Sequence, residues 1–342
     1  MPSVLRSVSG NLLVCLSGLI VSHVAFADTT MCVSSSAELQ TALNTAAASG
    51  STGLQWIQVV QGAYDFSGSQ VSSVNISNKA SLLLEGGYAS GCASKVTGAQ
   101  ATTLDGVSFF WLSAGTDITV KDLSIVTLVN PPPLASGVGM DAPGTLVLDR
   151  VKIQGATLDG DDYVTLFGAS IRATNLAISS STHVNCALLP ISNVQKGGLL
   201  FLVHISVAVE QGSGVCLDGY AWDAAIGVTM VNSIVETDVG NNDVLVNTTG
   251  PVTLQHNIYG ARQDMSGAQI TMDGDTLWGW DVFADASNAD LRPAMTLGLP
   301  AIDMGDPTSD GVLDDILGQP RLNNRPDIGA YESDRIFGAT FN

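Results

Sequence analysis

The stretch Ile118-Thr-Val-Lys-Asp-Leu-Ser-Ile125 decides the fold, because the chain repeats its pattern five more times. The later copies begin 28, 25, 29, 28 and 24 residues after one another, at Leu146, Ile171, Leu200, Val228 and Val252. Each copy alternates apolar and polar residues, which is the period of a strand with one buried face. A recurring interval of this size indicates a repeat architecture, in which each unit stacks on the one before it.

A shorter strand precedes each copy, and no helical pattern separates the strands. The short strands are expected at 110–112, 138–140, 164–166, 187–189, 215–217 and 244–246. The absence of crossover helices argues against doubly wound α/β sheets and (β/α) barrels. Parallel strands can then pair only if the chain coils once per repeat. We therefore predict an all-β fold, a right-handed parallel β-helix.

The register of the copies makes two further predictions. The first residues of the six copies, Ile118 through Val252, should form one buried column inside the coil. A second column should lie at a bend, where polar residues that tolerate a left-handed or turn backbone are suitable. Its members are Asp122, Arg150, Asn175, His204, Asn232 and His256.

Residues 1–27 have the pattern of a secretory signal peptide. Arg6 supplies the positive charge, 12–21 form an apolar run, and Ala25-Phe-Ala27 is a small-residue cleavage site. The apolar run is too short to span a bilayer, and no later stretch qualifies as a transmembrane segment. The sequence therefore predicts export to the cell envelope or the extracellular space.

The remainder, 28–342, is expected to form a single β-helix domain. We assign 28–106 to an N-terminal cap and the first turns, 107–260 to the regular turns, and 261–342 to C-terminal turns and a loop-rich cap. Ser35 followed by Glu38 is a capping-box pattern, which predicts a short helix after it. Such a helix would cover the first turn, because a solenoid needs a polar cover over its end.

Removal of the signal peptide would leave four cysteines, and an even number in an exported chain suggests disulfides. Three pairings are open, and buried free thiols are the alternative. We favour Cys32–Cys92 and Cys186–Cys216, because the second pair is separated by 30 residues. That separation is close to one repeat and would place the two cysteines on neighbouring turns.

The charge of the chain restricts its partners. Without residues 1–27, 12 Lys and Arg stand against 32 Asp and Glu. Nucleic acid requires a basic face, so this composition argues against it. Polyanionic ligands are also disfavoured unless a cation mediates their binding.

Motifs at both ends resemble a known family. The C-terminal motifs are Asp314-Asp-Ile-Leu-Gly-Gln-Pro-Arg321 and Asp327-Ile-Gly-Ala-Tyr-Glu332. The N-terminal ones are Cys32-Val-Ser, Gly62-Ala-Tyr, Leu84-Glu-Gly-Gly-Tyr88 and Cys92-Ala-Ser. The chain resembles exported bacterial right-handed β-helix proteins of the pectate-lyase-like superfamily, choice-of-anchor type. The resemblance implies the fold and export, and it implies no particular activity.

Pectate-lyase-like enzymes use carboxylate-bound Ca²⁺ and a basic residue that abstracts a proton. The nearest constellation here combines Asp159, Asp161 and Asp162 with Lys152 and Arg172. We favour the alternative that these residues are surface and turn ladders of a repeat protein. We therefore expect no cofactor and assign no metal ligands; the alternative is a bound Ca²⁺.

Two consecutive repeats carry longer loops, at 190–199 and 218–227, and both loops should lie at the same corner of the coil. They would form one raised lip. Its candidate ligand-binding residues are Lys196, Asp218, Tyr220, Trp222 and Asp223. Aromatic rings beside carboxylates can stack on sugars and hydrogen-bond to hydroxyl groups. Alternatively, Trp222 could fold back under its own loop.

The sequence thus favours an exported, non-catalytic β-helix protein that contacts glycans or cell-surface partners. The alternative is a Ca²⁺-dependent polysaccharide lyase that acts on a uronate-containing polymer. The alternatives differ in charge requirement, since a strongly acidic body repels a uronate chain whereas a neutral glycan needs no cation.

Overall fold

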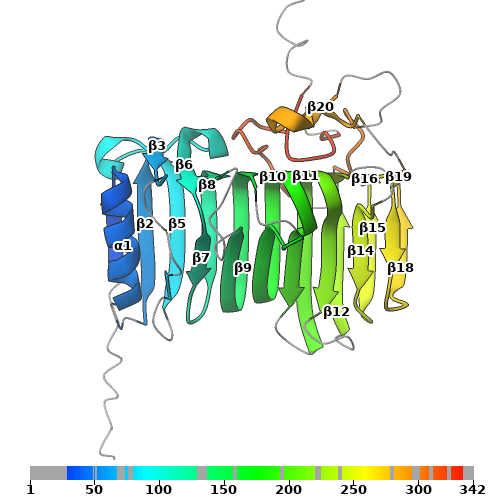
Figure 1. The fold of residues 1–342 in the computed structure, drawn as a ribbon, viewed down its shortest axis with the longest axis horizontal. Helices are drawn as coiled ribbons and strands as arrows, with labels where there is room; N and C mark the ends of the chain where they lie inside the picture. Colours follow the sequence, from blue (N-terminus) through cyan, green and yellow to red (C-terminus); the bar gives the residue numbers. More distant parts are fainter. Residues whose placement is uncertain are drawn as a thin grey trace, which may run out of the picture.

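The computed structural model is a parallel β-helix of about seven turns. Its strands lie side by side along one long axis (Figure 1). The structure describes residues 29–48, 50, 52–67, 74–75, 80–128, 137–156, 160–192, 196–219, 225–237, 241–277, 281–294, 301–307, 311–321 and 325–333. None of the helices within these ranges is long and apolar enough to cross a bilayer.

The regular elements follow the repeats of the sequence. They are β1 (Thr29–Val33), α1 (Ser36–Ala48), β2 (Leu54–Val60), β3 (Gly62–Asp65), β4 (Val74–Asn75), β5 (Ser81–Tyr88), η1 (Ser90–Cys92), η2 (Ala99–Ala101), β6 (Thr102–Val107), β7 (Phe110–Ser113), β8 (Ile118–Thr127), β9 (Val138–Gly155), β10 (Val164–Ser192), β11 (Lys196–Gly219), β12 (Ala225–Val231), β13 (Ile234–Glu236), β14 (Val244–Asn247), β15 (Pro251–Gln255), β16 (Ile258–Tyr259), β17 (Arg262–Asp264), β18 (Gln269–Asp273), β19 (Thr276–Leu277), β20 (Phe283–Asp285), η3 (Ala286–Asn288) and β21 (Asp290–Pro293).

Each regular rung of the coil contributes to three sheets. The first sheet holds the residues before the bend, such as 118–121, and the second sheet holds those after it, such as 123–127. The third sheet holds the short strands, such as β7 and β14. Strands β9, β10 and β11 continue around corners without a break, which explains their lengths of 18, 29 and 24 residues.

The predicted interior column is confirmed. Ile118 pairs in register with Leu146, and the pairing continues through Ile171, Leu200, Val228 and Val252. All six side chains are at most 2% exposed. Burial of one such aliphatic side chain contributes about 1.5–3 kcal/mol, so this column is a major source of stability.

Gln55 is a polar residue in the same column. It pairs with Leu82, which in turn pairs with Ile118. Its side chain is 0% exposed, and neither its amide nitrogen nor its amide oxygen has a hydrogen-bond partner. A buried amide without partners lowers stability, by about 1–3 kcal/mol in mutational data.

Replacement of Gln55 by Leu is therefore expected to raise the free energy of unfolding by about 1–3 kcal/mol, because the unpaired amide is removed while side-chain size is kept. Urea denaturation of the two proteins measures the change. Leu82→Gln, one rung along the same column, is the matched control and should destabilise the protein. A Gln55→Leu variant that is less stable than wild type would contradict the prediction.

The predicted bend column is also present. Asp122, Arg150, Asn175, His204, Asn232 and His256 all have φ between 51° and 54° on six successive rungs. Such left-handed conformations are rare for residues other than glycine, and Asn and Asp tolerate them best because their short side chains bond locally. In this protein the side chains of Asp122, Asn175 and Asn232 also form hydrogen bonds with segments outside the coil.

The first rung is covered by α1, which lies at one end of the coil (Figure 1). The hydroxyl of Ser35 accepts a hydrogen bond from the Glu38 amide at 3.3 Å, and the Glu38 carboxylate accepts one from the Ser34 amide at 2.7 Å. This is the predicted capping arrangement, displaced by one residue on its reciprocal side. The buried face of α1 consists of Leu39, Ala42, Leu43 and Ala46.

The C-terminal segment refines the expectation of a cap over 261–342. Residues 261–277 continue the coil as β17, β18 and β19. The described residues from 281 onward lie instead along the side of the coil, above its middle rungs in Figure 1. There they form a second apolar core with the outer face of the second sheet. This core contains Ala177, Ala208, Ile234 and Ile258 of the sheet and Val282, Phe283, Leu291, Ala301, Ile316, Ile328, Ala330 and Tyr331 of the tail.

The bend column anchors this tail through hydrogen bonds to its backbone. The Asn232 amide group donates to the carbonyl of Asp306 at 3.1 Å and accepts from its N–H at 2.8 Å. Asn175 donates to the Asp314 carbonyl at 2.8 Å. Arg321 in the tail donates to Asn175 Oδ1 at 2.7 Å and forms a buried ion pair with Glu332 at 3.2 Å. The left-handed column therefore binds the tail in addition to forming the bend of the coil.

Candidate functional site

Both cysteine pairs favoured from the sequence form disulfides. Cys32 of β1 is bonded to Cys92 of η1, with a Cα–Cα distance of 6.0 Å, and Cys186 is bonded to Cys216 with a distance of 5.9 Å. The second bond lies outside the main core, in a small apolar cluster with Leu189. Half-buried Ile191 and Leu245 pack against this cluster. The outer face of the third sheet is thus apolar near the predicted lip.

The loops expected at 190–199 and 218–227 are shorter than predicted, because β10 continues to Ser192, β11 runs from Lys196 to Gly219 and β12 begins at Ala225. Only 193–195 and 220–224 lie between these strands, and both segments are outside the described residues. On one side Ile191 pairs with Asp218, and on the other side Lys196 pairs with Ala225. The loops therefore leave and re-enter the coil on neighbouring rungs at one corner. Of the candidate residues, Asp218 is described, and its Oδ1 accepts a hydrogen bond from Asn247 at 3.0 Å. Tyr220, Trp222 and Asp223, and the side chain of Lys196, lie outside the described residues.

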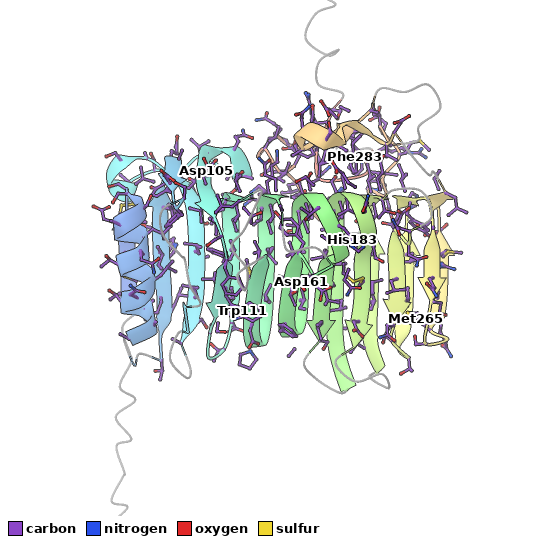
Figure 2. The ribbon with its side chains drawn as sticks, viewed as in Figure 1. Asp105, Trp111, Asp161, His183, Met265 and Phe283 are labelled. Carbon is purple, nitrogen blue, oxygen red and sulfur yellow. A yellow bond between two sulfur atoms is a disulfide. The ribbon has the colours of Figure 1, made fainter. Side chains whose placement is uncertain are left out.

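Three aromatic side chains gather on the third sheet, at rungs that precede the lip. The rings of Phe109 and Trp111 are stacked, with centroids 6.0 Å apart and an interplanar angle of 16°. The ring of Phe167 lies 6.2 Å from that of Trp111. All three side chains are half-buried on the outside of the coil. We name Phe109, Trp111 and Phe167 the aromatic patch; Trp111 is labelled in Figure 2.

The backbone positions the aromatic patch. Trp111 pairs in register with Gly139 on the next rung, and a Cβ atom on Gly139 would approach the Trp111 ring to 2.1 Å. The glycine therefore allows the indole to lie across the neighbouring strand. The indole N–H donates to Ser113 Oγ at 3.1 Å, which holds the ring in this orientation.

A carboxylate lies beside the aromatic patch. Asp141 pairs in register with Ser113 on one side and with Phe167 on the other. Burial raises the pKa of Asp141 above its usual value. A partly desolvated carboxylate next to aromatic faces is an arrangement that can accept hydrogen bonds from the hydroxyl groups of a stacked sugar.

The aromatic patch was not predicted from the sequence. Phe109 and Trp111 are two residues apart, so a strand places them on the same face, and this signal was readable. The position of Phe167 beside them follows only from the pairing of β7 with β9 and of β9 with β10.

The residues considered for lyase chemistry do not converge. Lys152 is on the second sheet, where its Nζ donates to the Ala289 carbonyl at 3.0 Å, and burial lowers its pKa. Arg172 is on the first sheet, with its guanidinium 4.9 Å from the ring of Phe201. Asp161 and Asp162 precede the third sheet, at another corner. The three locations face different sides of the coil.

Asp162, one of these candidates, and Asp315 in the tail both accept hydrogen bonds from other residues of the protein. Asp162 accepts a hydrogen bond from Asn185 Nδ2 at 2.8 Å, and burial raises its pKa. In the tail, Asp315 accepts from the amides of Leu317 and Gln319 at 2.9 and 2.7 Å. Among the residues that the structure describes, no three His, Cys, Asp or Glu side chains are grouped as a metal site would require. Asp159 is outside the described ranges.

Asp122 in the bend column is a buried carboxylate, and basic side chains of the protein compensate its charge. Asp122 accepts hydrogen bonds from Arg150 at 2.7 Å and from the Gly98 amide at 2.7 Å, and it is bonded to Lys95. Burial opposes the ionisation of Asp122, but these hydrogen bonds outweigh that effect and lower its pKa. Asp122 therefore holds the loop of Gly98 against the coil.

Comparison of the chain with models of protein families, with curated proteins and with solved structures gave no match.

Proposed function

We propose that this protein is an exported, non-catalytic β-helix that binds neutral glycans on the outer face of its third sheet. The contact surface would extend from the aromatic patch to the lip formed by 190–199 and 218–227. The observation that carries the proposal is the aromatic patch itself, in which the Trp111 ring contacts both Phe109 and Phe167 on the outside of the coil. Half-exposed aromatic rings on a rigid scaffold are suited to stacking on the apolar faces of sugars.

The charge of the protein supports a neutral ligand. The chain has a formal net charge of −19, and Asp141 is the titratable group beside Phe167 in the register. A polyanion would be repelled by this field. A neutral sugar can instead donate its hydroxyl groups to the carboxylate.

Export is part of the proposal. The two disulfides are compatible with an oxidising compartment, and residues 1–27 have the pattern of a signal peptide. Membership of the pectate-lyase-like, choice-of-anchor group likewise rests on the motifs at the two ends of the chain.

The alternative, a Ca²⁺-dependent polysaccharide lyase, has less support, because Lys152, Arg172 and Asp162 lie on different sides of the coil. It has a direct test. If the protein is a lyase, its incubation with polyuronates and Ca²⁺ would produce unsaturated products that absorb ultraviolet light. Their appearance would favour the alternative over a binding function.

Loss of the aromatic patch is expected to weaken glycan binding by about fivefold or more, because truncation of an aromatic anchor at the centre of a contact surface commonly costs more than about 1 kcal/mol. The test compares Trp111→Ala and Phe167→Ala with wild type, using calorimetry against neutral β-linked oligosaccharides. Phe201→Ala is the matched control, since Phe201 is also half-buried but contacts Arg172.

The lip is tested separately by Tyr220→Ala with Trp222→Ala. Weaker binding in both sets of variants, with Phe201→Ala unaffected, supports a continuous surface. Wild-type protein that binds none of the neutral oligosaccharides would overturn the proposal. Binding that depends on Tyr220 and Trp222 but not on Trp111 would restrict the site to the lip.

A further inference from the structure

The last rung of the coil ends in open strand edges. Strands β17, β18 and β19 each pair on one side, with β14, β15 and β16 respectively. Within the part of the chain that the structure describes, no strand pairs with their other side. β18 is the end of the coil opposite α1 in Figure 1. An open edge presents backbone donors and acceptors to any strand that can pair with them.

This rung also exposes the interior of the coil. Ile270 and Met272 continue the columns of Val252 and Leu254, which are 0% exposed. Met272 is 53% exposed. Met265 and Leu277 on the same rung are 52% and 72% exposed, and Met265 is labelled near this end in Figure 2. The first rung, by contrast, is covered by α1. A solenoid end that exposes its core requires a cover.

The sequence of β18 is complementary to itself in the antiparallel direction. If two copies of Gln269–Asp273 pair about Thr271, Gln269 faces Asp273 of the other copy. Ile270 then faces Met272, and the two threonines face each other. Amide–carboxylate, apolar and Thr–Thr pairs are all favourable across antiparallel strands. A pairing centred on Asp273 would instead oppose two carboxylates, which is unfavourable.

The strand lacks the features that commonly prevent edge pairing. Gln269–Asp273 contains neither Lys nor Pro, the residues that most often protect an edge. Its one charge, Asp273, lies at the end of the strand, where the centred register gives it an uncharged partner. Charge and side-chain pattern therefore select one register of association with a second copy.

We propose that two copies of this protein associate end to end through β18, on a two-fold axis that passes between the two Thr271 residues. The interface is isologous, because the same rung contributes from each copy. Growth stops at the dimer, since α1 covers the apolar interior at the other end of each coil with its own buried face. The dimer covers the apolar rung and presents two third-sheet faces, so it would raise the avidity for a repeating ligand.

The mass of the purified, disulfide-bonded protein tests this directly. Light scattering after size-exclusion chromatography should give twice the mass of one chain. Thr271→Lys should give the single-chain mass, because two ammonium groups would meet at the axis. Thr253→Lys is the matched control: Thr253 is the partner of Thr271 one rung inside the coil and points to the same side. That variant should stay dimeric.

Substitutions of Gln269 test the register, because Gln269 of each copy faces Asp273 of the other copy. An acidic residue at 269 would weaken both contacts, whereas a basic residue would strengthen both. Gln269→Asp should raise the dimer Kd by about fivefold or more, and Gln269→Lys should lower it by a similar factor. Sedimentation equilibrium measures both constants. A wild-type protein that is monomeric at about 100 µM, far above the Kd of a specific dimer, would overturn the proposal. So would a dimer that survives Thr271→Lys, or a ladder of larger assemblies.

Discussion

Replacement of Arg321 by Met is expected to lower the free energy of unfolding by about 3–5 kcal/mol. The side chains of Arg321 and Glu332 are 3% and 0% exposed, and their charged atoms are 3.2 Å apart. Without the guanidinium, Glu332 would lose this counter-charge in a buried place. Arg321 also donates to Asn175 Oδ1 and to the Gly329 carbonyl, at 2.7 and 3.0 Å, so its loss would release the tail from the bend column. Urea denaturation and the rate of proteolysis of the tail measure the two effects.

A matched control is available within the tail. Arg292 pairs with Asp290, but its side chain is 53% exposed, so Arg292→Met should cost less than about 1 kcal/mol. The double variant Arg321→Met with Glu332→Gln should recover part of the loss, because the carboxylate that paired with Arg321 is replaced by a neutral amide. Equal effects of Arg321→Met and Arg292→Met would show that the buried pair does not hold the tail.

Loss of the Cys32–Cys92 disulfide is expected to lower the free energy of unfolding by about 4 kcal/mol, as the chain-entropy relation gives for a loop of this size. The two cysteines are 60 residues apart, and the bond joins β1 on the first rung to η1 beyond β5. The variant carries Cys32→Ser and Cys92→Ser, and its melting is compared with that of wild type. Cys186→Ser with Cys216→Ser should cost slightly less, because that loop spans 30 residues.

Wild-type protein unfolded with and without a reductant separates the cross-link from the altered side chains, because its sequence is unchanged. The reduced protein should match the sum of the two double variants. A loss below about 1 kcal/mol in both double variants would mean that the stacked rungs restrict the unfolded chain little.

The repeat determined the coil from the sequence alone. Alternation of period two identifies which side chains point inward, and the interval between copies identifies which of them stack. These two periods were sufficient to predict the column from Ile118 to Val252 and the left-handed bend from Asp122 to His256. The 30-residue separation of Cys186 and Cys216 was informative for the same reason.

Local irregularities were beyond this reasoning. The short strand expected at 187–189 is displaced, because the pairing slips between Val184 and Cys186 and places Leu188 opposite Val215. A slip of one residue changes which neighbours meet across rungs while it preserves the alternation along the strand. The apolar–polar alternation is the same with or without such a slip, so the sequence pattern could not predict it.

Tertiary structure alone decided the position of the tail and of the aromatic patch. The tail has no period, and its place over the second sheet depends on contacts such as Asn232 with Asp306, which are 74 residues apart. The meeting of Trp111 with Phe167 likewise requires two successive strand pairings and the space above Gly139. Repetition within a sequence specifies contacts between equivalent residues of neighbouring copies. Contacts between non-equivalent residues depend on the shape and hydrogen-bonding groups of surfaces that exist only after the coil has formed.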